Sequence, residues 1–227
     1  MKAEHYILDL DNTLYDYNGP HKKAMAAVLD NFSNEFALAM KKTVESFKIA
    51  RQKTHSELLH TAASHNRLLY FQKMLELNGI NSLEYAMFYY NLYWDTFLEN
   101  MVLYESAKVF LLRIKNAGLG VCLLTDLTAH IQYRKIERLG LSEFVDFVVT
   151  SEEVGVEKPD AKMFKTALGK LNCNHDQALM IGDNWEKDIL GAAAMELKAI
   201  WINHDQERKE IPENVIEVHN FEEINRL

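Results

Sequence analysis

Short apolar runs recur along much of the sequence and constrain its fold more than any other feature. The runs, rich in Ile, Val and Leu, stand at residues 5–10, 119–124, 145–149, 178–181 and 198–202. They do not alternate cleanly between polar and apolar residues, which is typical of strands buried on both faces of a parallel sheet. Helix-like stretches at residues 128–138, 160–171 and 186–195 separate the last four runs. This alternation predicts a doubly wound, Rossmann-like α/β fold with a parallel sheet.

The residues between the first and second runs follow a different pattern. From about residue 16 to residue 100 the sequence has a helical period, few Gly or Pro, and no convincing strand. Aromatic and Met side chains crowd residues 68–98, which is more typical of the core of a helical bundle than of a substrate pocket. The sequence therefore predicts an α-helical cap domain at residues 16–100, inserted into a core domain made of residues 1–15 and 101–227.

Composition excludes several classes of protein. The 227 residues include 25 Lys plus Arg and 33 Asp plus Glu, a formal net charge of −8, so no overall attraction to nucleic-acid polymers or anionic membranes is expected. No apolar run reaches the roughly 18 residues that a membrane-spanning helix requires. The N-terminal apolar stretch meets Asp9 at once and is interpreted as a strand, not a signal peptide. Because Cys122 and Cys173 form no CxxC pair, reduced thiols and a cytoplasmic location are expected.

Acidic residues follow three of the apolar runs. Asp9 and Asp11 end the first run, Thr125 and Asp126 end the second, and Asp183 follows the fourth. Ligands of open α/β sheets bind beyond the carboxyl ends of the strands, so Asp9, Asp11, Thr125 and Asp183 are expected to converge there. Gathered carboxylates repel one another unless a cation lies among them. Because Mg²⁺ prefers oxygen ligands and water, the pattern predicts a magnesium site.

A lysine and a loop complete the candidate site. Lys158 precedes Pro159, whose ring restricts the preceding backbone to extended conformations, so the lysine is placed with some rigidity. Its ammonium can neutralise both a carboxylate and a phosphate oxygen. The Thr125 hydroxyl and the Asp126 backbone N–H can donate to the same phosphate, although Thr125 considered alone is more typical of a helix N-cap. Only the combination of these groups indicates a site for phosphoryl transfer.

Four short motifs stand in a fixed order along the chain. The segment DLDNTL covers residues 9–14, Thr125 and Lys158 follow, and GDNWEKD covers residues 182–188. In this order they resemble the four motifs of the haloacid dehalogenase (HAD) superfamily. The segment TSEEVGVEKPDAKMF at residues 150–164 is similar to a branch of that superfamily with a helical cap, whose members include pyrimidine nucleotidase-like and phosphoglycolate phosphatase-like enzymes.

The resemblance implies roles for the three aspartates. Asp9 would attack phosphorus and form an aspartyl-phosphate, which divides one hard hydrolysis into two easier steps. Asp11 would protonate the leaving oxygen and then accept a proton from the attacking water. The Asp9 side chain, the Asp11 carbonyl and Asp183 would hold Mg²⁺.

The resemblance also implies a set of groups that bind the phosphate. Thr125, the Asp126 N–H and Lys158 would contact its oxygens, and such fixed donors usually contribute most to catalysis. Asp188 would orient Lys158 or a metal-bound water. Motif two departs from the usual pattern of the branch, because Asp126 and Leu127 replace Asn and Gly. Leu127 adopts a positive φ less readily than glycine, and Asp126 adds negative charge near the phosphate unless its carboxylate points away.

The sequence thus predicts a magnesium-dependent phosphatase acting on a small phosphorylated metabolite. Nucleoside monophosphates come first among the candidate substrates, ahead of phosphoglycolate and sugar phosphates. Dehalogenases of the superfamily typically lack the second aspartate of motif one, so Asp11 favours a phosphatase. A 2-haloacid dehalogenase, a phosphomutase and a catalytically weak phosphate-binding protein stay open as alternatives. The sequence does not predict the oligomeric state.

Overall fold

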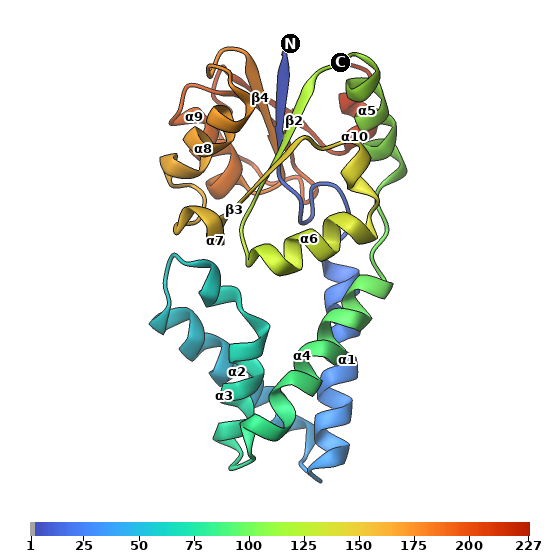
Figure 1. Cartoon of the computed structure of the whole chain (residues 1–227), viewed down its shortest axis with the longest axis vertical. Coiled ribbons are helices and arrows are strands. Elements are labelled where there is room, and N and C mark those ends of the chain that lie inside the picture. The colour runs from blue at the N-terminus through green and yellow to red at the C-terminus, as the bar shows by residue number, and fades with distance from the viewer. Residues whose placement is uncertain (1–2) are drawn as a thin grey trace. The chain divides into compact units, whose positions relative to one another are not determined.

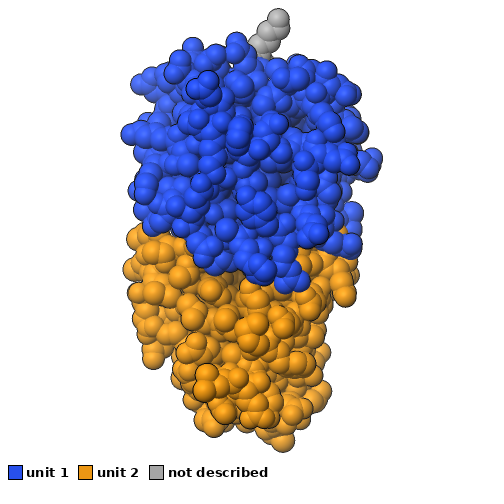
Figure 2. Space-filling model, viewed as in Figure 1, with its two compact units in different colours: residues 1–16, 102–227 blue, residues 17–101 orange. Residues whose placement is uncertain are grey.

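The computed structural model describes residues 3–227, and these residues form two compact units (Figure 2). One unit extends to Asp16 and resumes at Val102, and the other comprises Tyr17–Met101. The first unit contains the sheet and the second is helical. Each unit is described by itself below.

Parallel strands in the order β3-β2-β1-β4-β5-β6 form one sheet in the first unit (Figure 1). Their bounds are β1 His5–Leu8, β2 Gly120–Thr125, β3 Phe147–Thr150, β4 Ala178–Gly182, β5 Lys198–Ile202 and β6 Val215–Val218. Five of them coincide with the apolar runs, whereas the sequence did not indicate β6. The prediction of a doubly wound parallel sheet is confirmed, because the strands are parallel and helices lie between β2, β3, β4 and β5 along the chain.

The helices of this unit cover both faces of the sheet (Figure 1), which explains why β2 and β4 are apolar along most of their length. Their bounds are α5 Glu105–Asn116, α6 Ala129–Arg138, η2 Leu141–Glu143, α7 Ser151–Val154, α8 Ala161–Leu171, η3 Trp185–Leu190, α9 Gly191–Ala193 and α10 Phe221–Ile224. Side chains of α8 such as Met163 and Phe164 are fully buried in a core that includes Ile7 and Met180 of the sheet.

The register of the central strands aligns their carboxyl ends. Leu8, the last residue of β1, pairs with Leu123 of β2 on one side and with Ile181 of β4 on the other. The residues that follow these strands therefore leave the sheet at one edge, which is where open α/β sheets bind ligands.

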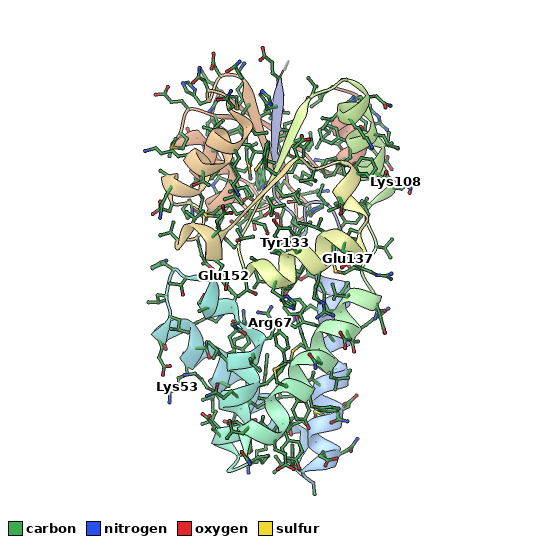
Figure 3. The ribbon with its side chains drawn as sticks, in the orientation of Figure 1. Lys53, Arg67, Lys108, Tyr133, Glu137 and Glu152 are labelled. Carbon is green, nitrogen blue, oxygen red and sulfur yellow. The ribbon has the colours of Figure 1, made fainter. Side chains whose placement is uncertain are left out.

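The helical unit is built from four long helices and one short turn, with bounds α1 Asn18–Glu35, α2 Met40–Glu57, η1 Ala62–His65, α3 Arg67–Leu77 and α4 Ser82–Glu99. Its core is aromatic, as Tyr93, Trp94 and Phe97 of α4 are almost completely buried. Arg67 at the start of α3 (Figure 3) lies over the ring of Trp94 at 5.8 Å, and its guanidinium donates to the Tyr17 hydroxyl at 2.6 Å. The fold-class prediction of an α-helical cap inserted into the α/β fold is confirmed.

Within residues 3–227, no helix combines the length and the apolarity that crossing a bilayer requires.

Candidate active site

The loop that follows β1 brings two motifs together through one hydroxyl. Thr13 Oγ1 lies 2.9 Å from Asp9 Oδ2 and 3.3 Å from Asp183 Oδ1. The same oxygen accepts a hydrogen bond from the Asp183 backbone N–H at 3.1 Å. The loop can turn back in this way because Asn12 adopts a φ of 63°, a left-handed conformation that Asn tolerates. The fully buried Thr13 thereby fixes Asp9 next to Asp183.

Lys158 lies between two buried carboxylates. Its Nζ is 2.6 Å from Asp9 Oδ1 and 2.6 Å from Asp188 Oδ1, and only 4% of the residue is exposed. Burial by itself lowers the pKa of Lys158, but Asp188 and Asp9 outweigh it and hold that pKa well above its ordinary value. Lys158 is therefore a charged ammonium directed at the proposed nucleophile.

Gly182 allows Asp188 to reach this lysine. A Cβ atom at Gly182 would overlap Asp188 Oδ2, so no larger residue fits unless the carboxylate moves. Asp188 Oδ2 accepts the Asn184 backbone N–H at 3.0 Å, while Oδ1 accepts Lys158. Both oxygens of Asp188 are thus engaged in holding the lysine and the loop after β4.

Three carboxylates gather around one point. Asp9, Asp183 and Asp188 each place an oxygen within 4.8 Å of the others. Burial raises the pKa of Asp9 to about 7, against the opposing effect of Lys158. Burial, reinforced by the negative charge of Asp9, raises the pKa of Asp183 to about 8. A divalent cation fits beside Asp9 and Asp183, because its charge would offset both the burial and the carboxylate repulsion that raise their pKa values.

The Thr125 hydroxyl is oriented by a glutamine from α6. Gln132 is fully buried, and its Nε2 donates to Thr125 Oγ1 at 2.6 Å and to the Asp126 carbonyl oxygen at 2.7 Å. Since Thr125 Oγ1 accepts this bond, the hydroxyl proton can be directed to an acceptor such as a phosphate oxygen. The contact between Gln132 and Thr125 was not predicted from the sequence.

The Asp126 carboxylate is held by two lysine residues. Its Oδ1 accepts the Lys158 backbone N–H at 3.0 Å, and its Oδ2 lies 2.8 Å from Lys187 Nζ. Leu127 adopts a φ of 115°, so the backbone takes the left-handed conformation that glycine would favour. The ammonium of Lys187 therefore compensates the unusual carboxylate of Asp126. Lys187 was not among the residues that the sequence predicted for the site.

Pairing between Asp126 and Lys187 leads to a testable expectation. Lys187→Met leaves the Asp126 carboxylate without its ammonium partner, so kcat/KM for p-nitrophenyl phosphate should fall about tenfold. Asp126→Asn in the same background should recover most of that loss, since residues in contact couple by about 1 kcal/mol. Steady-state kinetics of the two single variants and the double variant measure the coupling. Lys198→Met, at an exposed position, is the control, and additive effects of Lys187 and Asp126 would contradict the pairing.

A cavity of about 160 Å³ lies at this edge of the sheet. Every residue that the sequence selected for the site lines it: Asp9, Asp11, Thr125, Asp126, Lys158, Asp183 and Asp188. Asn12, Asn184 and Lys187 complete the lining. The structure thus brings all the selected side chains to one place, while their chemical roles stay predictions.

Comparison with known proteins identifies the family. A model of the haloacid dehalogenase-like hydrolases matches residues 3–196. A ribulose-1,5-bisphosphate 5-phosphatase of Halopiger xanaduensis is 37% identical over 203 residues, which cover 88% of this chain and 85% of that protein. A pyrimidine 5'-nucleotidase of Escherichia coli is 40% identical over 97 residues, 42% of each chain. The crystal structure of a 2-haloacid dehalogenase from Pseudomonas syringae superimposes with a TM-score of 0.77, at 23% identity, covering 99% of this chain and 97% of that one.

The chain belongs to the haloacid dehalogenase-like hydrolase family. This membership confirms the resemblance drawn from the four motifs. It also confirms that the chain is an enzyme, and the curated relatives place it with the phosphatases of the family. The similarity to the dehalogenase structure shows the fold alone.

Proposed function

We propose that the protein is a magnesium-dependent phosphatase that hydrolyses a small phosphorylated metabolite through an aspartyl-phosphate on Asp9. One observation carries this proposal: the Asp9 carboxylate lies between Lys158 and Thr13 at a cavity that Asp11 also lines. A nucleophile, a neighbouring acid and base, and a fixed cation are the groups that hydrolysis of a phosphate ester requires.

The first half of the reaction transfers the phosphoryl group to the protein. Asp9 attacks phosphorus, the bond to the leaving oxygen breaks, and Asp11 donates a proton to that oxygen. Thr125, the Asp126 N–H and Lys158 bind the phosphate oxygens in the transition state. The Asp9 side chain, the Asp11 carbonyl and Asp183 would hold Mg²⁺, whose charge would offset the repulsion between Asp9 and the phosphate.

The second half regenerates the enzyme. Asp11 is now a carboxylate and accepts a proton from water, whose oxygen attacks phosphorus and displaces Asp9. Asp188 keeps Lys158 in place through both halves, since its Oδ1 lies 2.6 Å from the ammonium. Free phosphate and the dephosphorylated metabolite leave.

In the metal-free protein, the raised pKa values of Asp9 and Asp183 should make the free energy of unfolding depend on pH. A raised folded-state pKa means that folding takes up protons, so this contribution to stability is complete below about pH 4 and is lost as pH rises towards about pH 8. In EDTA the free energy of unfolding should therefore fall across this window more steeply in the parent than in Asp183→Asn. Mg²⁺ should stabilise the parent increasingly as pH rises, because it competes with those protons. Urea denaturation over the pH series measures both effects.

An equal gain from Mg²⁺ in the parent and in Asp183→Asn would contradict the metal assignment. Asp205→Asn, which alters an exposed carboxylate outside the cavity, is the matched control. It should respond to Mg²⁺ as the parent does.

Sugar phosphates are the first substrates to test. The ribulose-bisphosphate phosphatase aligns over most of both chains, so its similarity is not confined to the α/β core. Nucleoside monophosphates come second, because the nucleotidase similarity extends over less than half of each chain. Release of inorganic phosphate from a panel containing both classes, with a haloacid tested for halide release, separates these substrates and the dehalogenase alternative. Isomerisation of a sugar phosphate without phosphate release would indicate a phosphomutase.

We also propose that the helical unit, Tyr17–Met101, acts as the cap that selects the substrate, as the prediction of a domain at residues 16–100 implied. Tyr93, Trp94 and Phe97 of α4 are almost completely buried, so they support its folding rather than binding. The cytoplasm is the proposed location, and the buried thiol of Cys122, free of a disulfide, supports a reducing compartment. Fractionation of cells that express the protein tests this location.

A further inference from the structure

Helix α6 contributes two buried polar side chains to the edge of the sheet where the cavity lies. Gln132 and Lys135 are three residues apart, which places them on one face of a helix, and both are fully buried. Tyr133 and Glu137 (Figure 3) are exposed on the same helix. Because α6 begins shortly after the carboxyl end of β2 (Figure 1), its buried face meets the loops that carry the candidate site.

Lys135 binds both oxygens of the Asp11 carboxylate. Its Nζ lies 2.8 Å from Asp11 Oδ1 and 2.7 Å from Asp11 Oδ2. The buried hydroxyl of Tyr15 also donates to Asp11 Oδ1. Asp11 is thus held by two groups that lie outside the four motifs, while 29% of its side chain stays exposed.

Burying an ammonium is energetically costly unless a carboxylate compensates it, so a lysine at this position has to be explained. An apolar residue would fill the same space on α6 without that penalty. The pairing with Asp11 explains the buried charge. A contact with both carboxylate oxygens restricts the rotation of the short Asp11 side chain, which follows the end of β1. Asp11 lines the cavity in this fixed orientation.

We propose that Lys135 is a positioning residue that orients the Asp11 carboxylate towards the leaving oxygen of the substrate. This inference rests on the proposed function, in which Asp11 is the acid and base. A displacement of about 1 Å in a reacting group can lower a rate about 100-fold. Loss of Lys135 should therefore weaken the proton transfer and leave the attack by Asp9 nearly intact.

Substituted phenyl phosphates separate these two steps. The p-nitrophenolate ion leaves without a proton, whereas the more basic phenolate and p-methoxyphenolate ions depend on protonation. For each ester, kcat/KM reports the reaction up to phosphorylation of Asp9. In Lys135→Met we expect kcat/KM to fall about 10- to 100-fold for the basic leaving groups and less than about threefold for p-nitrophenyl phosphate.

Two further variants give the experiment its control. Lys135→Arg keeps a cation that binds a carboxylate at two points, and it should recover most of the loss for the basic leaving groups. Tyr15→Phe removes only the second donor to Asp11, and a smaller loss of the same selectivity is expected. Combining Lys135→Met with Asp11→Asn should add nothing to the effect of Asp11→Asn alone. Urea denaturation of each variant shows whether it is folded.

The outcomes distinguish this inference from the proposed function. An equal decrease for all esters in folded Lys135→Met would overturn the positioning role, because a general structural defect slows every substrate alike. A loss confined to the basic leaving groups supports it. Failure of the proposed function would instead appear as hydrolysis that persists in Asp9→Asn, whatever the effect of Lys135.

Discussion

Asp9→Asn is expected to lower kcat for p-nitrophenyl phosphate in Mg²⁺ at least about 1,000-fold. The amide has nearly the shape of the carboxylate but cannot attack phosphorus, so the loss reflects the missing nucleophile. Lys158 keeps its second partner, since Asp188 Oδ1 also lies 2.6 Å from its ammonium. The fold should therefore be retained, and steady-state assays with matched urea denaturation curves test both statements.

Asp9→Asn should also change the stability of the metal-free protein. Burial raises the pKa of Asp183 and negative charge on Asp9 raises it further, so neutralising position 9 relieves repulsion in the metal-free protein. At about pH 8 in EDTA the variant should be at least as stable as the parent. Asp205→Asn, exposed on the surface, should change neither activity nor stability. Undiminished hydrolysis by folded Asp9→Asn would show that position 9 is not the nucleophile.

Lys158→Met should have the largest effect on stability. The lysine is 4% exposed and bridges Asp9 and Asp188, so its removal leaves buried carboxylates without a cation. Breaking a buried ion pair by removing one partner costs about 3–5 kcal/mol. We expect a loss of this size in the free energy of unfolding in EDTA, measured with urea, and a loss of phosphatase activity of at least about 100-fold.

Magnesium should separate the two effects of Lys158→Met. A divalent cation near Asp9 and Asp183 supplies part of the missing positive charge, so stability should recover partly while activity does not. Lys108→Met removes a lysine exposed on α5 (Figure 3), and its stability should lie within about 0.5 kcal/mol of the parent. A Lys158→Met protein as stable as Lys108→Met would contradict the charge balance described for the site.

Much of the α/β fold could be predicted because burial on both faces leaves a strong pattern. Runs such as residues 178–181 have no polar alternation, and β4 is buried along its whole length. The strand β6, Val215–Val218, is different because Ile216 and Glu217 are not fully buried. An edge strand of four residues with this mixed pattern resembles a loop in sequence, so periodicity did not reveal it.

The candidate site could be selected residue by residue because its groups occupy loops after buried strands. Parallel strands present their carboxyl ends at one edge, so Asp9, Thr125 and Asp183 were expected together, and the cavity gathers them. Lys158 was found by its place before Pro159 and by its order among the motifs. The local pattern was therefore informative wherever a functional residue lay next to a strand or a proline.

Other contacts of the site had no local signal. Lys135 lies on a helix rich in polar residues, and its sequence context does not separate a buried lysine from a solvated one. Only packing of α6 against the sheet shows that Lys135 meets Asp11 across 124 positions of sequence. Likewise, the sequence indicated that Asp126 adds a negative charge near the phosphate. It did not indicate that Lys187 compensates this charge.

Sequence by itself determined the family, the α/β class and the identity of the groups at the strand ends, because hydrophobic period and motif order are local properties of a chain. Tertiary structure alone decided which cation faces each carboxylate: Lys158 faces Asp9, Lys135 faces Asp11 and Lys187 faces Asp126. Ion pairs between distant segments depend on distances of a few ångströms and on burial, and both arise only when the helices pack on the sheet.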